Sequence, residues 1–130
     1  MSTATMTKEA KLTTEQVAHR LHDFLLKNDT KSAQEQLYAK DAISIEPHSM
    51  NGYEKETHGL DGIIAKRKKF EQETEKIDSV TVSEPVVSGN SFALRLEMDI
   101  AMKGQEPKPM SELAVYTVKD GKIVSEQFFI

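Results

Sequence analysis

Glu46 is the side chain of this sequence best placed to do acid–base chemistry. It stands directly before Pro47, at the end of a short apolar stretch. Because proline disfavours the helical conformation for the residue before it, we expect Glu46 to be extended, at a strand end from which its carboxylate can be aimed into a cavity. The alternation of Ser44 and Glu46 with Ile43 and Ile45 also permits the opposite orientation, with the isoleucines inside and Glu46 in solvent.

A basic run over 66–69 is the other candidate for binding chemistry. Acidic residues follow one helical turn later, so that Arg67 is within reach of Glu71 and Lys69 within reach of Glu73. We therefore interpret the run as a solvated, self-paired helix face and not as an anion site.

Helices come first among the elements that must position these residues. Thr13 and Gln16 match a capping box, and the apolar spacing after them predicts a helix that ends near residue 28. A shorter helix over 30–37 and a strand over 42–46 follow. A third helix is expected to start at residue 60.

The connection between that strand and the third helix is predicted to be a loop. Residues 48–58 are polar, with Asn51 and Gly52 as a turn signal. We expect this loop to be flexible and to act as a lid over whatever the strand end faces. His48 and His58 within it are expected to be exposed.

The second half of the chain is predicted to be all strand. Residues 91–102 alternate strictly, which places one set of side chains on a common face, namely Phe92, Leu94, Leu96, Met98, Ile100 and Met102. Strands over 77–87, 110–118 and 123–130 surround it, with a tight turn at Asp120 and Gly121. The order ααβαββββ, in which helices precede an antiparallel meander, indicates an α+β fold.

Length and composition limit the classes of function. The 130 residues suit one domain, which we place at 13–130 behind a flexible tail over 1–12. A net charge of −4 argues against partners such as nucleic acid or an anionic membrane, and the lack of cysteine rules out disulfides and thiolate chemistry. No stretch has the apolar length of a signal peptide or a membrane span, so we expect a cytoplasmic protein.

Four short motifs follow one another along the chain, namely the helix-to-strand junction 37–42, the Glu46-Pro47 pair, the helix start 59–63 and the closing hairpin 120–124. In this order they resemble the SnoaL-like family, within the superfamily of ketosteroid isomerases and nuclear transport factor 2. The resemblance covers about residues 13–130. It implies a cone-shaped fold, a curved antiparallel sheet wrapped around three helices, with an apolar pocket inside.

The resemblance also implies roles for individual residues. Glu46 stands where isomerases of the superfamily carry their carboxylate base, and His22 stands where they carry an oxyanion-stabilising tyrosine. Their second donor, a protonated aspartate, corresponds to Ala114, which has no donor. Glu112 is the nearest carboxylate on that strand face. The same register implies the rest of the pocket lining, Phe92, Leu94, Leu96, Met98, Met110, Tyr116, Val124, Glu126 and Phe128.

Carboxylates gathered in an apolar cavity shift one another's pKa upward, so that one would be protonated or paired with His22. A raised carboxylate can abstract a proton next to a carbonyl, and a neighbouring acid or imidazole can stabilise the enolate, as in ketosteroid isomerase itself. The leading hypothesis is cofactor-independent proton abstraction in an isomerisation or a cyclisation, with Glu46 as base and His22 or Glu112 as its partner. A metal at Glu46, His22 and Glu112 is set aside because no local ligand motif supports it.

Structural roles without catalysis also fit these residues. His22 flanks a helical apolar stripe and is at least as consistent with a core-edge histidine, Glu112 and Glu126 are as consistent with surface ion pairs, and Tyr116 is consistent with the core. The chain is then a module that binds a small apolar or carbonyl-containing molecule without catalysis, or an interaction protein. The resemblance further implies a homodimer through the outer sheet face, which carries Arg95, Glu97 and Asp99.

Overall fold

The computed structural model describes residues 11–48 and 53–130. Helix α1 (Thr14–Leu26) begins at a capping box in which the Thr13 hydroxyl accepts from the Gln16 amide and the Gln16 side chain accepts from the Thr13 amide. Helix α2 (Thr30–Leu37) is capped by Asp29, whose carboxylate accepts from the Ser32 amide. Helix α3 (Leu60–Glu73) follows later in the chain.

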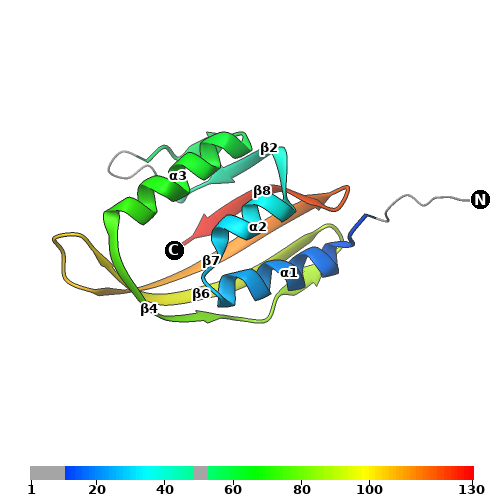
Figure 1. Ribbon diagram of the computed structural model, residues 1–130. Coiled ribbons are helices and arrows are strands. Elements are labelled where there is room, and N and C mark those ends of the chain that lie inside the picture. The colour runs from blue at the N-terminus through cyan, green and yellow to red at the C-terminus, as the bar shows by residue number, and fades with distance from the viewer. Residues whose placement is uncertain (1–10, 49–52) are drawn as a thin grey trace, which may run out of the picture.

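The strands are β2 (Tyr38–Ile45), β3 (Glu56–His58), β4 (Thr74–Val82), β5 (Val86–Ser88), β6 (Ser91–Met102), β7 (Lys108–Lys119) and β8 (Lys122–Phe129). They pair in the order β3-β2-β8-β7-β6-β4, with β5 beside β6. The sheet curves, and the three helices lie on one side of it (Figure 1). This is the expected α+β cone.

The sheet differs from the expected one in one respect. It is mixed, whereas a wholly antiparallel sheet was expected. Strand β2 runs parallel to β8, with Ser44 opposite Glu126, while the other pairs of described strands are antiparallel. A parallel pair requires a long crossover connection, and here most of the chain lies between the two strands. This pairing brings the Glu46 end of β2 to the Glu126 side of the meander.

Most predicted elements are confirmed, and the differences lie at edges. Strand β2 begins at Tyr38, directly after α2, and the expected strand over 77–87 is two strands, β4 and β5. The predicted loop 48–58 contains the short strand β3, which pairs with β2. The predicted turn at 51 and 52, and most of the predicted tail, lie outside the described residues. At the β7–β8 turn, Asp120 and Gly121 both have positive φ, 53° and 77°, as a tight hairpin turn needs.

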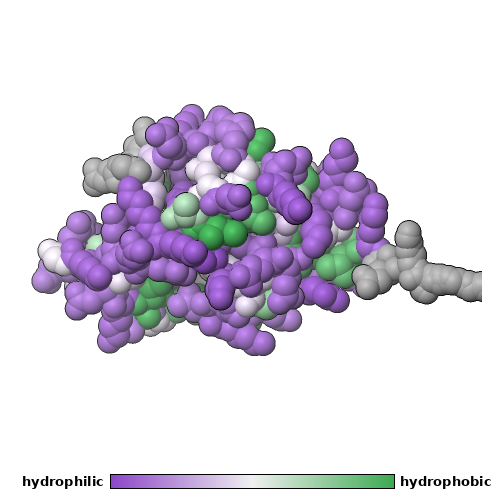
Figure 2. All heavy atoms as spheres, turned by 45° about the horizontal axis from the view of Figure 1, so that its top comes forward, coloured by the Kyte–Doolittle hydropathy of each residue, from purple (hydrophilic) through white to green (hydrophobic). Residues whose placement is uncertain are grey.

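The core lies between the helices and the concave side of the sheet. Val17, Ala18 and Leu21 of α1 are at most 1% exposed, and Ile63 of α3 is 1% exposed. The inner face of β6 meets them with its apolar residues, of which Phe92, Leu94, Leu96 and Ile100 are buried. The predicted faces of β6 are therefore confirmed. Figure 2 shows a mostly hydrophilic surface with several small hydrophobic areas among the polar side chains.

Candidate functional site

Glu46 faces the interior and forms an ion pair there. Lys66 reaches it from α3, with 2.8 Å between Lys66 Nζ and Glu46 Oε2, and it also donates to Ser44 Oγ over 2.7 Å. Ser44 is fully buried, so this side of β2 points inward and the alternative with both isoleucines inside is wrong. The Lys66 and Glu46 side chains keep 17% and 27% of their area exposed, which leaves the pair open to solvent.

A second carboxyl, Glu126, lies deeper and is 4% exposed. Its Oε1 accepts a hydrogen bond from the Tyr38 hydroxyl, and Ser44 is a further side-chain hydrogen-bond partner. Burial raises the pKa of Glu126, while the two hydrogen bonds and the charge of Lys66 oppose that shift. Ser44 therefore connects the Glu46–Lys66 pair to the buried Glu126.

Glu112 completes the group of carboxyls. Burial raises its pKa to about 7, and the negative charges of Glu46 and Glu126 add to the rise, while Lys66 lowers it. Near neutral pH the Glu112 carboxyl is thus close to half protonated. A group in this state can either take up or release a proton, which is what general acid–base catalysis requires.

Two phenols lie beside these carboxyls. Burial and then the charge of Glu126 raise the pKa of Tyr38 and of Tyr116 well above the ordinary value. Both therefore stay protonated, and the Tyr38 hydroxyl donates to Glu126. The Tyr116 ring also stacks on Phe92, with 4.8 Å between ring centroids and 17° between planes. We call Tyr38, Ser44, Glu46, Lys66, Glu112, Tyr116 and Glu126 the inner polar cluster.

His22 has other partners. Its Nε2 lies 3.8 Å from Glu84 and its Nδ1 3.8 Å from Asp23, so it sits by the β4–β5 connection. Its side chain is buried at the edge of the α1 core. The predicted partnership of Glu46 with His22 is replaced by the ion pair with Lys66, and the core-edge interpretation of His22 fits these contacts. Glu46, Glu112 and Glu126 lie near enough for their charges to act on one another. Their role in catalysis stays a prediction.

The residues predicted to line a pocket lie on the inner face of the sheet. Strands β6 and β7 pair with Phe92 opposite Tyr116, Leu94 opposite Ala114 and Met98 opposite Met110. Phe92, Leu94, Leu96, Ala114 and Tyr116 belong to the buried core, and Phe128 packs against it. That they contact a ligand stays a prediction.

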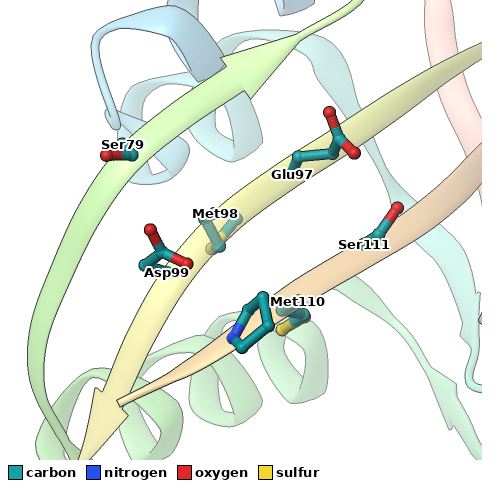
Figure 3. Close-up of a pocket in the computed structure, with 7 residues that line it drawn as sticks. Ser79, Glu97, Met98, Asp99, Met110 and Ser111 are labelled. Atoms are coloured by element: carbon teal, nitrogen blue, oxygen red, sulfur yellow. The ribbon is translucent and has the colours of Figure 1, made fainter.

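A hollow of about 430 Å³ lies at β4, β6 and β7 (Figure 3). It is lined by Ser79, Glu97, Met98, Asp99, Pro109, Met110 and Ser111. Glu97, Asp99 and Ser111 alternate along their strands with the inward residues, so they belong to the outer face. The hollow shares Met98 and Met110 with the predicted lining but none of its residues with the inner polar cluster.

Sequence reasoning missed three members of the cluster, Tyr38, Ser44 and Lys66. The basic run was interpreted as a solvated face, and this is wrong for Lys66, whereas the predicted Arg67–Glu71 pair is present at 3.4 Å. The spacing of Lys66 from apolar residues of the same helix could have indicated that its side chain turns inward. It lies three residues after Ile63 and four before Phe70, on the stripe that the helix turns inward.

Metal-binding groups and membrane-spanning helices are both absent from the described part of the chain. No group of three or more His, Asp or Glu side chains there is arranged to hold a metal ion. None of the helices described here is long and apolar enough to cross a membrane.

Comparison with known proteins first defines the class. The fold matches a nuclear transport factor 2-like protein of unknown function from Burkholderia pseudomallei, with a TM-score of 0.76, 16% identity and 92% of each chain covered. It also matches a protein with a cystatin-like fold from Xanthomonas campestris, with a TM-score of 0.77, 17% identity, and 91% of this chain and 90% of that chain covered. Both similarities establish the cone-shaped α+β fold.

The family follows from a closer match. A model of the SnoaL-like domain matches residues 12–130, and the chain belongs to this family. A crystal structure assigned as a SnoaL-like polyketide cyclase from Mesorhizobium loti is 32% identical, with a TM-score of 0.84, and the match covers 92% of this chain and all of that one. No curated protein matches this chain.

Proposed function

We propose that this chain binds a small, mostly apolar organic molecule against the inner polar cluster and moves a proton next to the molecule's carbonyl group. One observation carries the proposal: Glu46, Glu112 and Glu126 gather on the inner face of a family member, where Lys66 pairs with Glu46 and its charge lowers the pKa of the other two carboxyls. The polyketide cyclase assignment of the relative from Mesorhizobium loti supports it. An apolar lining with a few convergent polar groups is typical of small-molecule sites.

In this proposal Glu112 moves the proton. Its carboxylate takes a proton from the carbon next to the carbonyl, and the electron pair of that C–H bond forms the enolate. Where a double bond is conjugated with the enolate, the resulting dienolate takes the proton back from Glu112 at its far carbon, which is an isomerisation. Otherwise the enolate carbon attacks a second carbonyl, whose oxygen takes the proton from Glu112, which is a cyclisation. A pKa of about 7 suits Glu112 to both directions of transfer. Glu46, whose Oε2 is already held by Lys66, keeps the ammonium group in place.

Exchange of carbon-bound protons tests the function. A panel of apolar ketones is incubated in heavy water with the protein, and NMR measures deuterium uptake next to the carbonyl. Glu112→Gln is expected to lower the exchange rate by about a hundredfold or more. The control Glu106→Gln changes an exposed carboxyl and is expected to leave the exchange rate unchanged.

The outcomes separate the alternatives. If Glu46→Gln abolishes exchange and Glu112→Gln does not, Glu46 is the base. Binding without exchange in the native protein would favour a non-catalytic binding module, and an absence of binding would contradict the proposal.

A second role, self-association through the outer sheet face, is favoured by a separate observation. Leu113, Phe129 and Ile130 are 43%, 46% and 78% exposed. Leu113 lies opposite Phe129 on β8 and opposite Arg95 on β6, so an apolar strip adjoins the predicted charged face. A hollow of about 270 Å³ runs along it. We propose a homodimer in which this strip packs on its copy, because an isologous contact brings the same surface patch of both copies together and buries its apolar area on both sides.

A further inference from the structure

Lys66 is a fixed positive charge in a site otherwise lined by carboxyls, phenols and aromatic rings. Its ammonium group has three N–H donors. Within the described residues it gives hydrogen bonds to Glu46 Oε2 and Ser44 Oγ, at 2.8 and 2.7 Å. The Phe128 ring lies 6.0 Å away on another side. One donor therefore remains for a bound molecule, and its direction is set by the other two contacts.

The position of Lys66 is held from several sides. The ion pair and the Ser44 contact hold Nζ at β2, while the side chain starts from α3. Ser44 is fully buried and also hydrogen-bonded to Glu126, so its side chain is held in one position. An ammonium group fixed in this way does not have to reorganise when negative charge develops beside it. Such preorganised donors give the largest single contribution in many reactions that form oxyanions.

We propose that Lys66 binds the negatively charged oxygen of the molecule in this site, which therefore selects carbonyl compounds that exist as enolates or form them. The inference deepens the proposed function and rests on its claim that a ligand enters the inner polar cluster. In this proposal a residue of α3 binds the oxygen, whereas the family resemblance had implied His22 for that role.

The surrounding carboxyls permit an anion to enter. Glu46 is matched by the charge of Lys66, and Glu126 and Glu112 both have a raised pKa. An arriving anion favours protonation of Glu112, which then donates a hydrogen bond instead of repelling the charge. Tyr38 and Tyr116 stay protonated and add no negative charge. The ligand therefore meets one cation and a set of groups that can be neutral.

A matched pair of probes tests the proposal by calorimetry at neutral pH. Dimedone, a cyclic diketone, is present as an enolate at neutral pH, and its O-methyl enol ether has nearly the same shape without the charge. The native protein is expected to bind dimedone at least about tenfold more tightly than the ether. Lys66→Met is expected to abolish this preference, and Lys66→Arg to retain part of it because the charge remains. Lys68→Met, at an exposed position of the same helix, is the control and is expected to keep the preference.

Each outcome decides the proposal. Equal binding of both probes by the native protein, binding of neither, or an unchanged preference in Lys66→Met would overturn it. If Lys66→Met fails to fold, the double variant Lys66→Met/Glu46→Gln removes the pair without leaving an unpaired carboxylate, and persistence of the preference there would also overturn it. Failure of the proposed catalysis is distinguishable, because a Lys66-dependent preference for dimedone without carbon-proton exchange would leave this inference standing alone.

Discussion

The Tyr38 hydroxyl donates a hydrogen bond to Glu126 Oε1, which joins the first residue of β2 to a carboxyl near the end of β8. These residues are 6% and 4% exposed, so both lie in the buried interior. The contact depends on the parallel pairing of β2 with β8, in which Tyr38 lies opposite Ile123. The deepest part of the inner polar cluster is thus built across the fold's parallel pair of strands.

Tyr38→Phe should therefore destabilise the protein. It removes a donor from a buried carboxyl, and leaving a buried polar group without its partner costs about 1–3 kcal/mol. Urea denaturation measures the free energy of unfolding. Tyr53→Phe is the matched control, since it removes a hydroxyl that donates to Glu73 over 2.6 Å at an exposed site, and it should have a smaller effect. Equal effects of the two changes would mean that the buried contact has no special weight.

The Glu46–Lys66 pair should show energetic coupling. In a double-mutant cycle with Glu46→Gln and Lys66→Met, the coupling free energy is expected to be about 1–3 kcal/mol, because both side chains are partly buried and lie 2.8 Å apart. The exposed Arg95–Glu97 pair, at 2.6 Å, serves for comparison and should give less than about 1 kcal/mol. A coupling in the inner pair no greater than in the outer one would contradict the assigned burial and geometry.

Glu112 should make the protein less stable as pH rises. Its folded pKa is about 7 against an ordinary 4.5, so the unfolded chain releases this proton first. Stability from this group is full below about pH 4.5, declines as pH rises toward 7 and stays low above it. Glu112→Gln should therefore raise the melting temperature at pH above 7 by about 5 °C and change it little in acid. A gain of the same size at both pH values would show that ionisation is not the cause.

Self-association should depend on the outer apolar strip. Sedimentation of the native protein is expected to give the mass of a dimer, and the double variant Leu113→Glu/Phe129→Glu that of a monomer, because charge replaces apolar area at the contact. Leu26→Glu changes a residue of α1 that is 50% exposed and should leave the dimer intact. A native monomer at all concentrations would exclude this interface.

The order of elements was predictable because each has a strong local signal. The capping box at Thr13 and Gln16, the strict alternation over 91–102 and the Asp120-Gly121 turn all fix structure within a few residues. Local signals do not reveal which distant strands pair. The β2–β8 pairing and the short strand β3 depend on contacts between segments far apart in sequence, and the sheet was therefore expected to be wholly antiparallel.

The three carboxyl side chains of the site were predictable from the sequence, but the cation among them, Lys66, was not. The inward direction of Glu46, Glu112 and Glu126 follows from alternation once the inner faces are known. Lys66 belongs to a run of cations with acidic residues one turn later, and composition favours a solvated face for such a run. Only the position of α3 over β2 turns this one lysine toward Glu46 while Arg67 pairs with Glu71.

The protonation of Glu112 tests the account most directly, because the proposed proton transfer requires a carboxyl that titrates near neutral pH. With glutamate side chains labelled with carbon-13, NMR can follow the Glu112 carboxyl through a pH titration, and Glu112→Gln identifies its signal. We predict a midpoint near pH 7, where burial and the neighbouring carboxyls have placed the pKa. A midpoint near the ordinary 4.5 would mean that Glu112 is ionised and solvated at neutral pH, and would contradict its role as the proton-transfer group.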